Sequence, residues 1–195
     1  MTTTTGIVLF DDAEELDFAG PWEVFTMARM DGDAVVTVAE SERPVRCAKG
    51  LRVLPDHTFD DAPPLDVVLV PGGQGTRREV SNEVLTAWLA DQAESAAWVT
   101  SVCTGAFVLH AAGLTKAKRV TTHWASIDRL RELDDVTVLD DVRYVRDGSV
   151  VTSAGVSAGI DMSLWLVGQI YGVAHARLVQ RMMEYDPAPP YAAEV

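Results

Sequence analysis

The sequence predicts an α/β fold in which a mostly parallel β-sheet carries helices on both faces. Short, uninterrupted apolar runs alternate with segments of helical apolar spacing, as expected when strands are buried on both faces. Glycines and small polar residues gather directly after the predicted strands, and ligands of such sheets bind beyond the carboxyl ends of the strands. With 195 residues, the chain is expected to form a single domain over residues 1–195.

The composition argues against several classes of protein. A formal net charge of −13 disfavours nucleic acid as a partner, because phosphates are neutralised by Lys and Arg. No apolar run approaches the roughly 20 residues that span a bilayer, and no basic segment precedes an apolar one at the N-terminus. We therefore expect a cytoplasmic protein. Neither Cys47 nor Cys103 has a second Cys or His at a metal-ligand spacing, so no metal site is expected, and Cys47 is interpreted as structural.

The first predicted strand, residues 6–10, is followed by an acidic segment and a helix. Pro21 stands where the first residue of a helix is expected, which predicts a helix over 21–28. Asp17 would then lie in the loop before it, either drawn into the protein by its apolar neighbours or serving as a capping or surface acid. The next predicted elements are a strand over 34–39, a hairpin of 45–48 and 51–54, a strand over 65–70 and a helix over 81–95.

A glycine-rich stretch, residues 71–76, follows the strand over 65–70. Paired glycines after a strand allow backbone N–H groups to point into a site. The stretch contains neither Gly-Lys-Ser/Thr nor GxGxxG, which excludes a phosphate loop and a dinucleotide fingerprint. Two interpretations remain for Gly72 and Gly73, namely a plain turn or an oxyanion hole made of backbone donors.

Residues 98–113 form the most informative stretch of the chain. A β-branched apolar run stops at Cys103, Thr104 and Gly105 follow, and an apolar, alanine-rich segment then continues to Gly113. This order predicts a strand, a sharp turn and a helix, with the cysteine on the elbow. The amino end of a helix favours a thiolate, which makes Cys103 a candidate nucleophile. The alternative is a buried cysteine that acts as a small hydrophobe.

The second half of the chain adds His123 and Gly155 to the candidate site. A predicted strand over 119–124 runs into a helix over 125–133, so His123 either faces the same crevice as Cys103 or serves in capping or packing. A hairpin is predicted over 143–152, and a small-residue turn containing Gly155 leads into a helix over 160–182. Its predicted core stripe is Ile160, Leu164, Val167, Tyr171, Ala174, Leu178 and Met182.

Seven segments distributed along the chain resemble the ThiJ/PfpI superfamily, the flavodoxin-like relatives of class I glutamine amidotransferases. Within it, they are most similar to the branch that hydrates isocyanides. The segments begin with Leu16-Asp17-Phe18-Ala19-Gly20-Pro21 and include Val102-Cys103-Thr104-Gly105; the full set is residues 16–21, 65–75, 99–105, 111–114, 121–124, 158–161 and 184–190. The resemblance implies a flavodoxin-like sandwich with the cysteine on a nucleophile elbow.

The resemblance also implies roles for individual residues. Cys103 would be the nucleophile and Asp17 the acid/base group, while the backbone around Gly72, Gly73 and Thr104 would supply donors. Thr104 stands where peptidase-like members carry a histidine, so a Cys-His protease pair is not available here by the usual route. His123 and Gly155, which map to the same carboxyl edge of the predicted sheet, would line the substrate site. The family typically forms homodimers without a metal or organic cofactor.

The expected activity is addition of water to an isocyanide through a Cys103 thioimidate, which gives an N-substituted formamide. Two alternatives remain open. One is a glyoxalase-like or repair enzyme that acts on reactive carbonyls, an option that His123 supports although the acid is Asp17 rather than Glu. The other is a redox or ligand sensor without catalytic turnover, in which Cys103 would be oxidised to a stable sulfinate.

Overall fold

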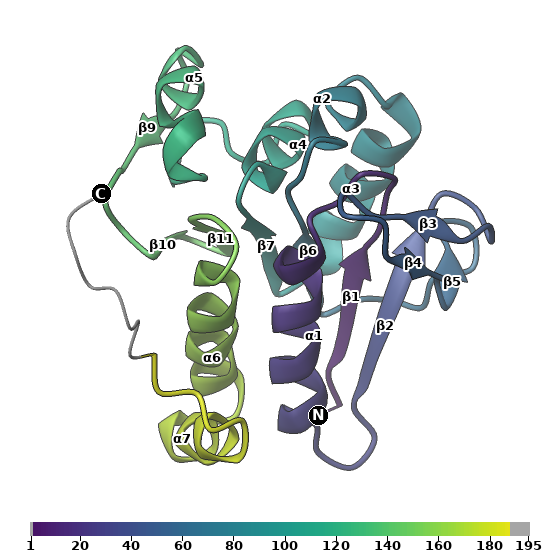
Figure 1. The fold of residues 1–195 in the computed structure, drawn as a ribbon, viewed down its shortest axis with the longest axis vertical. Coiled ribbons are helices and arrows are strands. Elements are labelled where there is room, and N and C mark those ends of the chain that lie inside the picture. Colours follow the sequence, from purple (N-terminus) through teal and green to yellow (C-terminus); the bar gives the residue numbers. More distant parts are fainter. Residues whose placement is uncertain (1, 188–195) are drawn as a thin grey trace.

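The computed structural model describes residues 2–187 and contains a central seven-stranded sheet (Figure 1). Its strand order is β10-β11-β7-β6-β1-β2-β5, and all neighbours are parallel except β10 and β11. The predicted α/β class with a mostly parallel sheet is therefore confirmed. The strands are β1 (Thr4–Val8), β2 (Ala34–Ala39), β5 (His57–Thr58), β6 (Val67–Val70), β7 (Trp98–Val102), β10 (Tyr144–Asp147) and β11 (Val150–Ser153).

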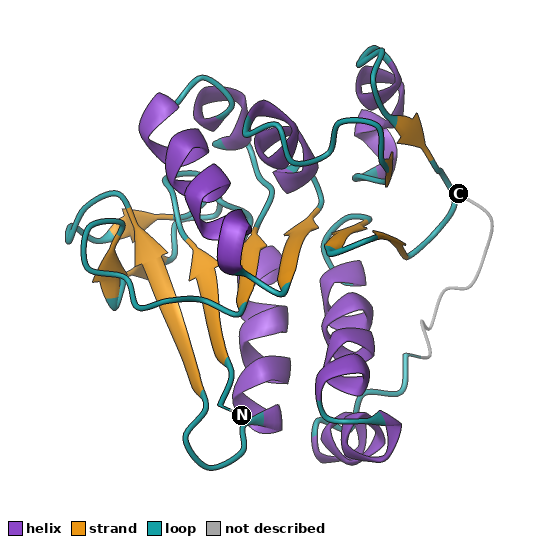
Figure 2. Ribbon diagram, turned by 180° about the vertical axis from the view of Figure 1, so that it is seen from behind, coloured by secondary structure: helices purple, strands orange, loops and turns teal. Residues whose placement is uncertain are grey.

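Helices cover both faces of this sheet (Figures 1 and 2). On one face, α1 (Glu15–Ala28), α6 (Ala158–Ile170) and α7 (Val173–Met182) pack against one another. On the other face, α4 (Gly105–Ala111) packs against α2 (Thr76–Glu79) and α3 (Glu83–Ser95). Because both faces are covered, the central strands are buried along their length, as every residue of β6 is. This burial explains why the strands read as continuous apolar runs rather than as alternating ones.

The predicted start of the first helix at Pro21 is wrong, because α1 begins at Glu15 and Pro21 lies inside it. A proline in a helix usually clashes with the Cβ of the residue before it and leaves a carbonyl without its N–H partner. The preceding residue here is Gly20, which has no Cβ and therefore avoids the clash. Asp17 consequently lies in the first turn of α1 rather than in a loop.

The single helix predicted over 160–182 is two helices, α6 and α7, separated at Gly172. Gly172 has φ +92°, a left-handed conformation that glycine adopts without strain and that changes the direction of the chain. The new direction rotates the second half of the predicted stripe away from the core. Val167 is buried as predicted, whereas Leu178 and Met182 are exposed and Val179 is the buried residue of α7.

The segment around His123 also differs from the prediction. The strand there is short, β8 (Arg119–Val120), and it pairs with β9 (Thr137–Val138) in a separate two-stranded sheet. The predicted helix is a 3₁₀ turn, η1 (Trp124–Ser126), followed by α5 (Ile127–Arg131). Both predicted hairpins are confirmed: β3 (Val45–Arg46) pairs antiparallel with β4 (Arg52–Val53), and β10 pairs antiparallel with β11.

Within residues 2–187, the structure contains no helix whose length and apolar character would allow it to cross a membrane.

Two glycines of α6 test the packing of this helix on the sheet. A Cβ at Gly159 would lie 2.9 Å from Cγ2 of the buried Val102, so Gly159→Ala is expected to destabilise the fold by about 1–3 kcal/mol. A Cβ at Gly168 would meet only ordinary contacts, the nearest at 3.6 Å, so Gly168→Ala is expected to stabilise it by about 0.5–1 kcal/mol through helix propensity. Urea denaturation measures both changes. Equal unfolding free energies for the two variants would contradict this packing.

Candidate active site

Cys103 lies on the sharp turn that joins β7 to α4, as the sequence predicts. Its φ of +56° places it in the left-handed region, which is unfavourable for a residue with a side chain. The surrounding backbone maintains this conformation. The Cys103 N–H points at the carbonyls of Ser153 (3.1 Å) and Ala154 (3.2 Å), and its own carbonyl accepts a hydrogen bond from the Thr122 hydroxyl at 2.8 Å. Neighbouring segments thus hold the thiol at the amino end of a helix.

Asp17 is the buried acid next to this cysteine, with no exposed surface. Its Oδ2 accepts a hydrogen bond of 2.9 Å from the Gly72 N–H. Its Oδ1 is buried and has no hydrogen-bond partner among residues 2–187. A Cβ at Gly72 would lie 2.7 Å from Asp17 Oδ2 and 2.7 Å from Cys103 Cβ. Only glycine therefore fits between the carboxylate and the cysteine.

The environment of Asp17 raises the pKa of its carboxyl group to about 7. Burial is the largest cause, since it disfavours the charged form, and the negative charge of Glu14 acts in the same direction. The Gly72 N–H, the Cys103 thiol and the Val156 N–H lower the pKa by smaller amounts. A carboxyl group with a pKa near neutrality is suited to exchange protons during a reaction.

The pKa of the Cys103 thiol is also raised, to about 12. Burial is again the largest cause, and the negative charge of Asp17 adds to it. The backbone N–H and the hydroxyl of Thr104 lower the pKa, but they do not outweigh burial. The expectation that the helix terminus favours the thiolate is therefore wrong, because burial has the larger effect on the Cys103 pKa. Cys103 is a thiol at neutral pH and needs a base to become a nucleophile.

The N–H groups of the glycine-rich stretch have partners within the protein. The Gly72 N–H bonds to Asp17, and the Gly73 N–H donates to Thr104 Oγ1 at 3.0 Å. Of the two interpretations of Gly72 and Gly73, an oxyanion hole of free N–H donors is therefore not present, and the two glycines bind the acid and Thr104 instead. Gly73 has φ +118°, and a Cβ there would lie 2.4 Å from the Asp12 carbonyl oxygen. The Thr104 N–H remains beside the sulfur.

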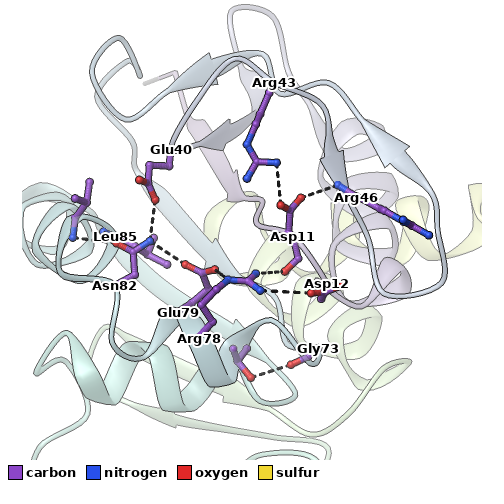
Figure 3. Close-up of polar contacts among 12 residues, drawn as sticks. Asp11, Asp12, Glu40, Arg43, Arg46, Gly73, Arg78, Glu79, Asn82 and Leu85 are labelled. Atoms are coloured by element: carbon purple, nitrogen blue, oxygen red, sulfur yellow. Dashed lines mark hydrogen bonds and ion pairs between the residues drawn. The ribbon is translucent and has the colours of Figure 1, made fainter.

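The loop that leads from β1 into α1 is fastened by Arg78 of α2 (Figure 3). The Arg78 guanidinium donates to the Asp11 carbonyl at 2.7 Å, lies 3.4 Å from the Asp12 carboxylate, and pairs with the buried Glu79 at 2.9 Å. Ala13, in the same loop, forms an isolated antiparallel bridge with Gly73, which follows β6. These contacts fix the start of α1 and therefore the position of Asp17.

His123 and Gly155, both predicted to line the site, lie against each other. A Cβ at Gly155 would be 2.1 Å from His123 Cδ2, so the imidazole occupies the space above the glycine. Nδ1 of His123 accepts a hydrogen bond from the Ala125 N–H at 3.2 Å and caps η1. Among the described residues, the structure records no hydrogen bond from His123 to Cys103 or Asp17. Its observed role is capping and packing.

A pocket of about 440 Å³ lies beside His123 and Gly155. Its lining includes His123 and Gly155 together with Trp124, Ile127 and Val156. A second pocket of about 440 Å³ lies beside Asp11 and Arg78. Its lining includes neither Cys103 nor Asp17.

Two residues near the site were not predicted from the sequence. They are Val156, whose N–H faces Asp17, and Arg143, which lines the pocket beside Gly155 and forms an ion pair with Asp161. Val156 follows Gly155 directly, so its place in the predicted small-residue turn was the available signal.

The model of the DJ-1/PfpI family matches residues 5–169 of the chain. The protein belongs to this family. The isonitrile hydratase of Pseudomonas putida is 44% identical over 191 residues, covering 98% of this chain and 82% of that protein. A glutathione-independent glyoxalase of Caenorhabditis elegans, DJR-1.2, is 31% identical and aligns with 83% of this chain and 85% of its own length.

Among solved structures, a ThiJ/PfpI family protein from Pseudomonas syringae superposes with a TM-score of 0.92 at 34% identity. The match covers 100% of this chain and 80% of that one. The flavodoxin-like fold expected from the sequence is thereby confirmed, as is membership of the superfamily. Of the seven resembling segments, the last extends past residue 187 and so lies partly outside the described residues.

Within the part of the chain that the structure describes, no three His, Cys, Asp or Glu side chains gather as ligands of a metal ion would.

The raised pKa of Asp17 predicts a dependence of stability on pH. The folded state binds the Asp17 proton more tightly than the unfolded state, so between pH 3.8 and about 7 this residue makes folding less favourable as pH rises. Asp17→Asn removes that loss. We expect the variant to gain stability over the wild type between pH 4 and pH 8, on the order of 2–4 kcal/mol. Urea denaturation across this range measures the gain.

Asp33→Asn provides a control of opposite sign. Burial alone would raise the pKa of Asp33, but the N–H groups of Met30 and Thr3 and the Tyr171 hydroxyl lower it below the ordinary value. Its charged form therefore stabilises the folded protein at pH values above the ordinary pKa of 3.8, and the variant should be less stable than the wild type at pH 8. If the unfolding free energies of the wild type and Asp17→Asn changed in parallel with pH, a raised pKa at Asp17 would be ruled out.

Proposed function

We propose that this protein is an enzyme that adds water to isocyanides and releases N-substituted formamides. The observation that carries the proposal is a fully buried Asp17 carboxyl group, with a pKa of about 7, held beside the Cys103 thiol by Gly72. The 44% identity to an isonitrile hydratase over nearly the whole chain supports the same activity.

The proposed first step adds the thiol to the terminal carbon of the isocyanide, R–N≡C. That carbon must gain a proton and a nucleophile. Above pH 7 the pair consists of an Asp17 carboxylate and a Cys103 thiol. The carboxylate takes the thiol proton and passes it to the carbon as the C–S bond forms. The product is a thioimidate, R–N=CH–S–Cys103, and Asp17 is again a carboxylate.

The second step hydrolyses the thioimidate. Asp17 takes a proton from water as the hydroxide adds to carbon, and the nitrogen receives that proton, giving R–NH–CH(OH)–S–Cys103. The C–S bond then breaks while the hydroxyl proton is transferred through Asp17 to the sulfur. The formamide R–NH–CHO leaves, and the thiol is restored. Dividing the addition in this way replaces one difficult step by two easier ones.

The pocket beside Gly155 is the proposed place for the substituent R. Its Trp124, Ile127 and Val156 side chains are apolar, which suits an alkyl or aryl isocyanide. In this role Gly155 and His123 are substrate-binding residues, as their predicted place at the carboxyl edge of the sheet suggested, and the Thr104 N–H and hydroxyl act on the sulfur. A homodimer and a cytoplasmic location stay predictions.

Variants of the two central residues test the reaction. Cys103→Ala is expected to abolish formamide production, because the covalent step requires the sulfur. Asp17→Asn is expected to lose roughly 10²- to 10⁴-fold in kcat, the usual contribution of a positioned acid/base group. Formamide absorbance with a simple alkyl or aryl isocyanide provides the measurement. Cys47→Ala is the matched control, since Cys47 is buried outside the site and should keep wild-type turnover.

Full turnover by Cys103→Ala would overturn the proposal. The Caenorhabditis elegans glyoxalase supports a second candidate, because it also aligns with most of this chain. The same preparations are therefore assayed with methylglyoxal. Turnover of methylglyoxal without turnover of isocyanide would assign this protein to the reactive-carbonyl branch.

The pH dependence tests the protonation state of Asp17. Because the carboxylate form accepts the thiol proton, kcat/KM is expected to rise with pH through an apparent pKa of about 7 and to level off above it. The residual kcat/KM of Asp17→Asn should not show this rise with pH. A kcat/KM that falls as pH rises through 7 would mean that the protonated acid is the reactive form.

A further inference from the structure

Thr76 belongs to a buried hydrogen-bond network that includes Thr104, the residue directly after Cys103. Its side chain is 1% exposed, and its Oγ1 lies 2.8 Å from the Gly73 carbonyl oxygen and 3.0 Å from Thr104 Oγ1. Thr104 Oγ1 in turn lies 3.2 Å from the same Gly73 oxygen and accepts the Gly73 N–H at 3.0 Å. The two threonine hydroxyls therefore share one backbone carbonyl.

Each hydroxyl has a single hydrogen to donate, so the two cannot serve every acceptor at once. The Thr104 hydrogen has two competing acceptors of interest, the Gly73 carbonyl and Cys103 Sγ. The Thr104 hydroxyl lowers the pKa of Cys103, as expected when it donates toward the sulfur. A sulfur that gains negative charge is the stronger acceptor, because hydrogen bonds to ionised groups exceed neutral ones.

Turning the Thr104 hydrogen toward the sulfur takes one donor away from the Gly73 carbonyl. Thr76 covers this loss, since its hydroxyl has the shorter contact with that carbonyl, 2.8 Å against 3.2 Å for Thr104. Its own N–H also points at the Gly73 oxygen, at 3.3 Å. When the hydroxyl and the N–H of Thr76 both donate to the Gly73 carbonyl oxygen, that oxygen no longer needs a hydrogen bond from Thr104.

We propose that Thr76 is a positioning residue: its hydroxyl satisfies the Gly73 carbonyl and thereby frees the Thr104 hydroxyl to stabilise the Cys103 thiolate. Thr76 acts through Thr104 and does not touch the sulfur. The inference rests on the proposed function only in that Cys103 is the reactive group. It deepens that proposal by adding a residue on α2 that determines how readily the thiolate forms.

The test is the rate of alkylation of Cys103 by iodoacetamide between pH 7 and pH 10, in a Cys47→Ala background so that one thiol reacts. Removing the hydroxyl in Thr76→Val, a variant of nearly the same shape, is expected to slow alkylation about tenfold at each pH, the size of one hydrogen bond to a charged group. Thr76→Ser keeps the hydroxyl and should stay within about twofold of the parent. The readout requires no isocyanide, so this proposal and the proposed function fail separately.

A double-mutant cycle with Thr104→Val distinguishes positioning from packing. If Thr76 acts through Thr104, then Thr76→Val has no further effect on alkylation once Thr104→Val is present. Thr115→Val is the matched control, because Thr115 is a buried threonine whose hydroxyl bonds to His110 beyond the far end of α4. It should leave alkylation unchanged.

Three results would overturn the proposal. They are an unchanged alkylation rate in Thr76→Val, a loss of rate in Thr76→Ser as large as that in Thr76→Val, or a further loss of rate when Thr76→Val is added to Thr104→Val. Thermal unfolding of each variant verifies that the alkylation rates belong to folded protein.

Discussion

The hydrogen bond from the Gly72 N–H to the buried Asp17 carboxylate is the interaction on which the rest of the site depends. A carboxyl group without exposed surface is costly to ionise, and this bond of 2.9 Å lowers its pKa more than the Cys103 thiol or the Val156 N–H does. The same glycine leaves the space in which Asp17, Cys103 and the Thr104 N–H meet, since a Cβ there would lie within 2.7 Å of all three. Any larger residue would separate the acid from the sulfur.

Two opposing effects act on the protons of this pair. The amino end of α4 and the Thr104 donors favour a thiolate, whereas burial and the nearby carboxylate disfavour it. Burial dominates, because the cysteine is only 7% exposed and desolvation disfavours its charged form. The proton therefore stays on the sulfur, while Asp17 titrates near pH 7. A thiol beside a carboxyl group of this pKa can exchange a proton with it near neutral pH.

The glycine-rich stretch serves the interior of the protein rather than its surface. Its N–H groups bind Asp17 and Thr104, and the Gly73 carbonyl receives the hydroxyls of Thr76 and Thr104. Arg78 ties the neighbouring loop to the same region. Except for the Thr76–Gly73 bond, these contacts join segments that follow different strands, so they fix the positions of Asp17 and Cys103 at the carboxyl edge of the sheet.

The sequence by itself determined the fold class, the strand-turn-helix at Cys103 and the sheet edge at which Asp17, Gly72 and Cys103 would meet. These properties follow from apolar periodicity and turn chemistry, which act over a few neighbouring residues. Only the tertiary structure decided that α1 begins before Pro21 and that Gly172 divides the last helix, since both depend on packing against other elements.

Tertiary structure also decided the proton affinities and the assignment of donors at the site. The partners of Asp17 and Thr104 are 55 and 31 residues away in the chain, and burial arises only when distant segments close around a group. A motif therefore identifies which residues meet, but desolvation and long-range hydrogen bonds set the charge that each one carries.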